Sequence, residues 1–161
     1  MDLVQHARDL YSNGRMHDAL EAAQAACDRA PKDPDAWWLL GRISRHTDMP
    51  AASDEAFRRA AQLDGRMVLP HRVSGERFQA LVAEARAALP EAVRRSLEPT
   101  AIRSVPMPSA DQVRAGLDPD ALTLRERTPH DVLVLFQVNH ENRCATEDAL
   151  RVLVAGSLTG S

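Results

Sequence analysis

The chain has 161 residues, of which 44% are hydrophobic and 27% are charged, and its formal net charge is −3. This composition is ordinary for a soluble globular protein, and the lack of a basic excess argues against a nucleic-acid-binding protein. No apolar run approaches the roughly eighteen residues of a transmembrane helix, and the first residues do not read as a secretory signal, so we expect no membrane partner. Cys27 and Cys144 lie far apart without metal-binding spacing, which favours reduced thiols in a cytoplasmic protein.

Residues 1–65 show helical periodicity almost throughout, and the pattern repeats after about 34 residues, the interval from Pro31 to Gly65. Small and large apolar side chains alternate at equivalent positions, which is typical of closely packed helices. The stretches that carry the repeat are "NGRMHDAL" (13–20), "PKDPDAWWLLG" (31–41) and "AFRRAAQLD" (56–64). They resemble the tetratricopeptide repeat, and the resemblance implies two helix–turn–helix motifs.

Tetratricopeptide repeats bind peptides on the concave face made by the first helix of each motif, and the resemblance implies such a groove here. The positions that map to this face are Arg8, Tyr11, Ser12, Trp38, Arg42, Arg45 and His46. Guanidinium forks suit carboxylates, so the set predicts a protein or peptide partner with acidic groups. The alternative is that Arg42 and Arg45 form a solvated face while Trp38 packs against a neighbour. Trp37 is expected to point into the repeat core.

A linker is expected at 66–73, followed by a helix over 74–89 with an apolar stripe from Phe78 to Leu89. Two motifs are few, because a solenoid generally needs about three repeats to bury its faces. We therefore expect the helix over 74–89 to cap the repeat and to join both halves of the chain into one body.

The remainder of the chain alternates short helices and short strands. A helix opened by Pro90 covers 90–98, and a second, short helix lies between a Ser109 cap and a Gly116 stop. The sequence predicts strands at 100–105, 120–127 and 131–138, then a loop at 139–145 and a final helix capped by Thr146. The expected fold class is mostly α with a small sheet (α+β).

A second resemblance rests on the order and spacing of three stretches. These are "RFQALVAEARAALPEAVRRSLE" (77–98), "GLDPDALTLRE" (116–126) and "DVLVLFQVNHENRCATEDALRVLV" (131–154). Together they resemble the small bacterial zincin-like metallopeptidases of the minimal gluzincin type. The resemblance implies a zincin-like domain over 74–161, in which the last helix would carry the zinc site.

In that family the last helix bears His-Glu-x-x-His, where the histidines hold Zn²⁺ and the glutamate activates water. This chain has Gly156, Ser157 and Gly160 at the matching register, and none of these can ligate zinc or act as a good general base. The resemblance thus implies an inactive domain with no catalytic residue, no metal and no cofactor. We read His140 as a residue of a solvated loop and Cys144 as a small buried group.

These observations predict a non-catalytic interaction or adaptor protein with an inactive peptidase-like scaffold. One alternative is a hydrolase with an unrecognised site or a site completed by a partner, for which His140 and Cys144 are the nearest candidates. Another is a homo-oligomeric structural protein whose subunits complete each other.

Overall fold

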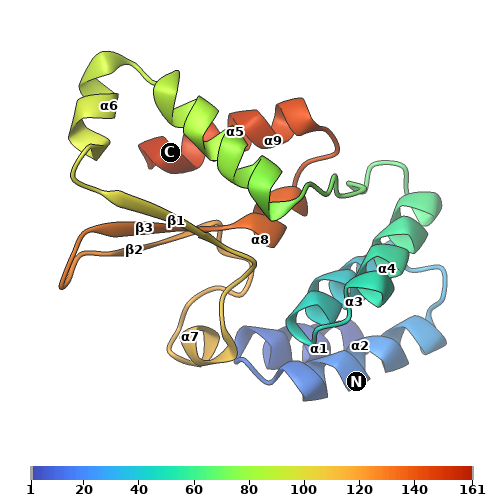
Figure 1. Cartoon of the computed structure of the whole chain (residues 1–161). Helices are drawn as coiled ribbons and strands as arrows, with labels where there is room; N and C mark the ends of the chain where they lie inside the picture. Colours follow the sequence, from blue (N-terminus) through green and yellow to red (C-terminus); the bar gives the residue numbers. More distant parts are fainter. Residues whose placement is uncertain (1, 161) are drawn as a thin grey trace. The chain divides into compact units, whose positions relative to one another are not determined.

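The computed structural model describes residues 2–160, and it is mostly helical with a small three-stranded mixed sheet, as the sequence predicts (Figure 1). The chain forms two compact units, Met1–Pro70 with Pro108–Asp120 and His71–Met107 with Ala121–Ser161. The sequence-based boundaries of 1–65, 66–73 and 74–161 thus differ from the structure in one main respect, because Pro108–Asp120 lies with the first unit.

The first unit contains the two expected helix–turn–helix motifs. They comprise α1 (Leu3–Ser12) with α2 (Met16–Arg29), and α3 (Pro34–His46) with α4 (Pro50–Leu63). Carboxylates cap the first helix of each motif, since the side chains of Asp2 and Asp33 accept hydrogen bonds from backbone N–H groups there. Gly41 allows the close approach of α3 and α4, because a Cβ atom at this position would lie 2.9 Å from the Phe57 ring.

The core of the first unit is completed by a segment that is distant in sequence. The short helix α7 (Ala110–Arg114) contributes Val113, which is buried together with Leu10, Leu39 and Ile43. The Ser109 cap predicted from the sequence is confirmed, as its side chain accepts from the backbone N–H of Gln112.

The second unit is built around a sheet of order β1-β3-β2. Strand β1 (Ala101–Val105) pairs in parallel with β3 (Val132–Phe136), which pairs antiparallel with β2 (Thr123–Glu126). The helices of this unit are α5 (Gly75–Ala87), α6 (Glu91–Leu97), α8 (Gln137–Glu141) and α9 (Glu147–Thr159). Helices α5 and α9 lie together beside the sheet (Figure 1).

The apolar stripe of α5 is buried within the second unit. Phe78 and Leu81 pack in one cluster with Leu135 of β3 and with Leu150 and Val154 of α9. The expectation that this helix caps the repeat is therefore wrong, because its stripe is used by the sheet and α9.

Two further features near the C-terminus bear on the site. Strand β3 ends at Phe136 and α8 follows at once, so the expected loop at 139–145 is partly helical. The predicted Thr146 cap of α9 is confirmed by its hydrogen bond from the backbone N–H of Ala149. None of the helices between residues 2 and 160 has both the length and the apolar character needed to cross a membrane.

Candidate functional site

The face formed by α1 and α3 holds a carboxylate supplied by the chain itself. Tyr11 donates from its hydroxyl to Oδ1 of Asp120 at 2.7 Å, and Arg42 donates from Nη1 to Oδ2 at 2.6 Å. Both oxygens of one carboxylate are thus engaged, one by a neutral donor and the other by a charged one. We call Tyr11, Trp38, Arg42, His46 and the Asp120 that they surround the carboxylate site.

Arg42 is positioned in this site by aromatic rings. Its guanidinium carbon lies 4.8 Å from the centroid of the Trp38 ring and 5.8 Å from that of Tyr11, which are cation–π distances. Trp38 is itself fixed by an edge-on contact to Phe57, with ring centroids 5.3 Å apart. Nε of Arg42 is buried and has no hydrogen-bond partner within residues 2–160.

His46 contacts the residue that precedes the carboxylate. Its ring donates a hydrogen bond to the backbone carbonyl of Pro119, which is buried, and lies edge-on to Tyr11 at a centroid distance of 5.3 Å. Burial lowers the pKa of His46, while the charge of Asp120 and the Pro119 carbonyl act in the opposite direction. Burial, followed by the charge of Asp120, raises the pKa of Tyr11 well above its ordinary value, so its hydroxyl stays a donor.

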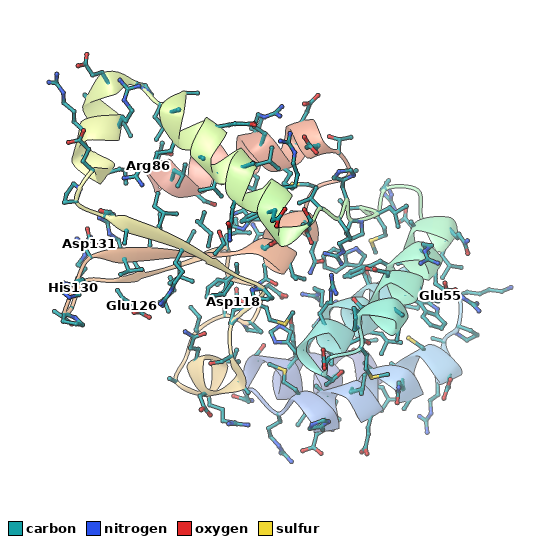
Figure 2. All side chains as sticks on the ribbon, in the orientation of Figure 1. Glu55, Arg86, Asp118, Glu126, His130 and Asp131 are labelled. Atoms are coloured by element: carbon teal, nitrogen blue, oxygen red, sulfur yellow. The ribbon has the colours of Figure 1, made fainter. Side chains whose placement is uncertain are left out.

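The loop that carries Asp120 is constrained on its own side as well. Gly116 has a φ of 113°, which ends α7 where the sequence predicts a stop. Asp118, labelled in Figure 2, then accepts a hydrogen bond from the backbone N–H of Asp120 at 2.8 Å. The turn and the buried Pro119 present the carboxylate to α1 and α3.

The structure brings together only part of the predicted groove. Tyr11, Trp38, Arg42 and His46 converge, whereas Arg8 and Ser12 are exposed on α1 and Arg45 is partly buried near the end of α3. Trp37 packs against the cluster of Ala26, Cys27 and Ala36. Sequence reasoning missed Pro119 and Asp120; the acidic turn "LDPD" (117–120) was visible, but nothing local showed which face it meets.

A second cluster of polar groups is buried in the second unit around His140. Nδ1 of His140 donates to the carbonyl of Phe136 at 2.8 Å, which leaves Nε2 to accept from the Ser157 hydroxyl at 2.8 Å. The side chain is fully buried beneath Phe78, so the expectation of a solvated loop histidine is wrong. Burial lowers the pKa of His140, which favours this neutral form.

Ser157 also lines a cavity of about 280 Å³ at the end of α9. The lining includes Gly160 of α9, Arg125 of β2 and Leu133 of β3, but no His, Cys, Asp or Glu. Within the described part of the chain, no three such side chains gather so that they could hold a metal ion. The described lining of this cavity thus offers no side chain of a type that usually binds zinc.

Glu141 fastens the start of the second unit to α8. It accepts from Nη1 of Arg72 at 3.2 Å, from the backbone N–H of Val73 at 3.1 Å and from Nε2 of Gln137 at 3.0 Å. Its side chain is 2% exposed. This arrangement satisfies a buried charge.

Family models, curated proteins and solved structures were each compared with this chain, and none of them matches.

Proposed function

We propose that this protein is a non-catalytic adaptor that binds a carboxylate-bearing protein segment on the α1/α3 face of its first unit. The second unit is, in this proposal, an inactive peptidase-like scaffold that uses no cofactor. The two free thiols, both buried, favour a reducing compartment, and we propose the cytoplasm.

The observation that carries the proposal is the Asp120 carboxylate between Tyr11 and Arg42. It supports the proposal, because an acidic side chain fits between a hydroxyl and a guanidinium held against Trp38. Asp120 is 27% exposed, so water and a competing carboxylate can approach it. A partner acid would take over the same donors, the Tyr11 hydroxyl and Nη1 of Arg42.

A peptide that copies the chain's own loop tests this chemistry. The probe is a fluorescein-labelled peptide of residues 116–122, offered to the full chain and to Asp120→Ala. Binding to the variant should be at least about tenfold tighter than to wild type, because the internal carboxylate no longer competes. A probe with Asn in place of the second Asp should bind poorly.

Matched variants test whether the gain in peptide affinity depends on the removal of Asp120 and on the presence of Arg42. Glu21→Ala removes an exposed carboxylate of α2 that lies outside the carboxylate site, and it should behave like wild type. Arg42→Ala added to Asp120→Ala should abolish the gain in affinity. Equal binding of the acidic and the Asn probes would remove carboxylate recognition from the proposal.

The alternative function, a hydrolase, is favoured by one observation, the hydrogen bond between Ser157 and Nε2 of His140. A serine nucleophile needs such a base, but it also needs donors for the oxyanion. Ser157 lies near the C-terminal end of α9, where the helix dipole is negative and opposes an oxyanion. A fluorophosphonate label that is lost in Ser157→Ala, or stoichiometric zinc that is lost in His140→Ala, would establish the hydrolase instead.

A further inference from the structure

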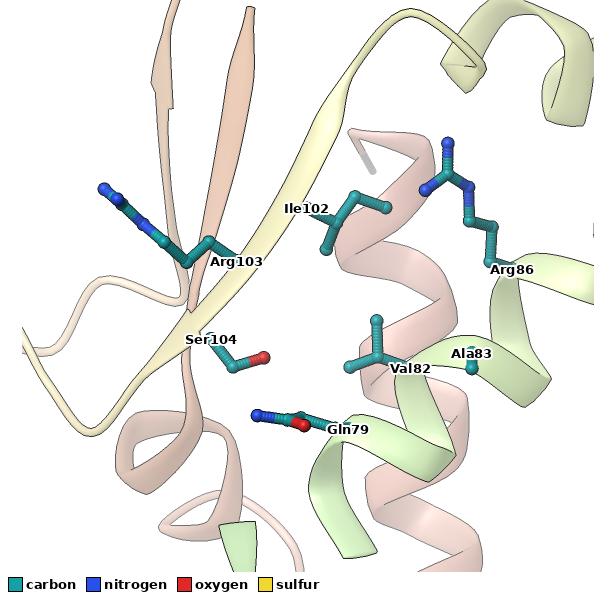
Figure 3. Close-up of a pocket in the computed structure, with 7 residues that line it drawn as sticks. All are labelled: Gln79, Val82, Ala83, Arg86, Ile102, Arg103 and Ser104. Atoms are coloured by element: carbon teal, nitrogen blue, oxygen red, sulfur yellow. The ribbon is translucent and has the colours of Figure 1, made fainter. Parts of the chain in front are cut away.

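A groove runs between α5 and the free edge of β1 in the second unit. It has a volume of about 450 Å³ and is lined by Gln79, Val82, Ala83, Arg86, Ile102, Arg103 and Ser104 (Figure 3). The α5 residues among these recur at helical spacing, so one face of the helix overhangs the strand. The lining contains two arginines and no acidic residue.

The backbone of β1 has an unused hydrogen-bonding edge along this groove. In the parallel pairing with β3, the N–H of Ala101 bonds to the carbonyl of Asp131, so alternate residues 101, 103 and 105 face β3. The N–H and C=O groups of Ile102 and Ser104 therefore point to the other side. No other backbone segment within residues 2–160 bonds to them.

The side chains along this edge divide between two faces. Figure 3 shows Ile102 and Ser104 directed toward the helices, whereas Arg103 points the opposite way. Ile102 packs partly against the core that Val82 lines, so the helix side of the groove is apolar in its middle. A residue placed opposite Ile102 or Ser104 would meet this side, and one placed opposite Arg103 would meet its guanidinium.

The groove lining carries the positive charges of Arg86 and Arg103. Arg86 donates from Nη2 to the carbonyls of Leu97 at 2.7 Å and Thr100 at 3.5 Å, which hold it beside the strand without neutralising it. Neither Arg86 nor Arg103 forms an ion pair with any carboxylate of residues 2–160. An occupant with acidic side chains would supply the missing charge.

We infer that the β1 edge binds an extended, acidic segment of a partner protein, which adds to the sheet as an antiparallel strand beneath α5. Main-chain hydrogen bonds to Ile102 and Ser104 give the affinity, and the arginines select acidic residues. The chosen occupant is a partner and not a second copy of this chain. A symmetric antiparallel pair of β1 strands centred on Arg103 would set two guanidiniums opposite each other, which is destabilising.

The probe that tests this inference is the fluorescein-labelled peptide Gly-Thr-Glu-Val-Glu-Gly, with both ends blocked. Its threonine lies opposite Ser104, its first glutamate opposite Arg103 and its valine opposite Ile102. N-methylation of the threonine and the valine removes the N–H groups that would face β1, and it should weaken binding at least about tenfold. N-methylation of both glutamates, whose N–H groups point away, should leave binding within about twofold of the parent peptide.

A protein variant gives the complementary test on the full chain. Ser104→Pro removes an outward N–H while sparing the β1–β3 ladder, since edge strands accept proline on the solvent side. It should weaken binding about tenfold, whereas Ser104→Ala, which keeps the N–H, should not. Arg103→Glu should reverse the preference in favour of a lysine-containing peptide. If Ser104→Pro does not fold, the N-methylated peptides still decide.

Amide exchange measured by NMR locates the bound peptide. In the free protein the amides of Ile102 and Ser104 should exchange faster than that of Arg103, and the peptide should slow both. The inference is wrong if the two N-methylated peptides bind equally, or if Arg42→Ala rather than Ser104→Pro abolishes binding. It is also wrong if light scattering shows a dimer that Ser104→Pro dissociates, because the edge is then occupied by a second copy.

Discussion

Each unit of the molecule contains an arginine–carboxylate pair that fastens a loop to a helix, but the two pairs differ in how completely they are enclosed. In the first unit, Arg42 of α3 holds Asp120, and the two side chains are 19% and 27% exposed. In the second unit, Arg72 holds Glu141 of α8, whose side chain is 2% exposed.

This difference in exposure affects whether another carboxylate can replace the one in the pair. Asp120 accepts from Tyr11 and Arg42 and remains open to water, so another carboxylate can compete for these donors. Glu141 accepts from Arg72, Val73 and Gln137 in the interior, and its removal would take a buried carboxylate away from the Arg72 guanidinium. We therefore propose the first pair as a ligand site, whereas the second has the burial expected of a structural clamp.

The largest effect is expected from breaking the clamp. Glu141→Ala should lower the free energy of unfolding by about 3–5 kcal/mol, because it removes one partner of a buried ion pair. Denaturant titration followed by circular dichroism measures this loss. Glu141→Gln keeps the volume and one acceptor, and it should cost less, about 1–3 kcal/mol. A loss below 1 kcal/mol for the alanine variant would contradict the clamp.

A smaller loss is expected at the exchangeable pair. Asp120→Ala should cost about 1–2 kcal/mol, since it removes a charge-assisted hydrogen bond in a site that water can reach. The same titration applies, with Glu21→Ala, at an exposed carboxylate of α2, as the control. If Asp120→Ala cost as much as Glu141→Ala, the loop would be structural and the contrast between the two pairs would disappear.

The pKa values of His46 and His140 provide another test of the difference between the two units. Burial lowers the pKa of both His46 and His140, but only His46 has Asp120 beside it to oppose this shift. Asp120→Asn should therefore lower the pKa of His46 further and leave that of His140 unchanged, as measured by NMR titration of the ring protons. An equal response of both histidines would contradict the assignment.

The same shifts predict how stability depends on pH. In the unfolded chain the histidines have a pKa of about 6.5, and in the folded protein the pKa values of His46 and His140 are lower. Between the folded and unfolded pKa values the unfolded chain therefore binds more protons than the folded protein. The free energy of unfolding should thus fall as the pH is lowered from 7 through that interval. Replacement of His140 by Gln should flatten this dependence.

The smallest effect is expected on the surface. Arg95 and Glu91 form an ion pair on α6 in which the side chains are 73% and 66% exposed. Glu91→Ala should change the free energy of unfolding by no more than about 0.5 kcal/mol, because solvent screens such pairs. A larger loss would show that the exposure of an ion pair does not predict its contribution to the free energy of unfolding, and it would weaken the comparison of the two pairs.

Local patterns were sufficient for most of the secondary structure. The repeat period predicted α1 to α4, and Ser109 and Gly116 bounded α7 correctly, because capping and turn geometry depend on a few neighbouring residues. The strand predicted at 131–138 is present but shorter, at Val132–Phe136. The apolar run continues from this strand into α8, and composition does not show where the strand ends.

By itself, the sequence determined the fold class, the helical repeat and the gathering of aromatic and basic residues on α1 and α3. Only the tertiary structure determined which polar and charged side chains pair with each other. Tyr11 and Asp120 are 109 positions apart, and His140 and Ser157 are 17 apart, so no local pattern predicts either hydrogen bond. The sequence does not show whether an arginine pairs with an internal carboxylate. Arg42 does, whereas Arg103 pairs with none in the described part of the chain. Only the packing of distant segments distinguishes the two, because pairing depends on proximity in space.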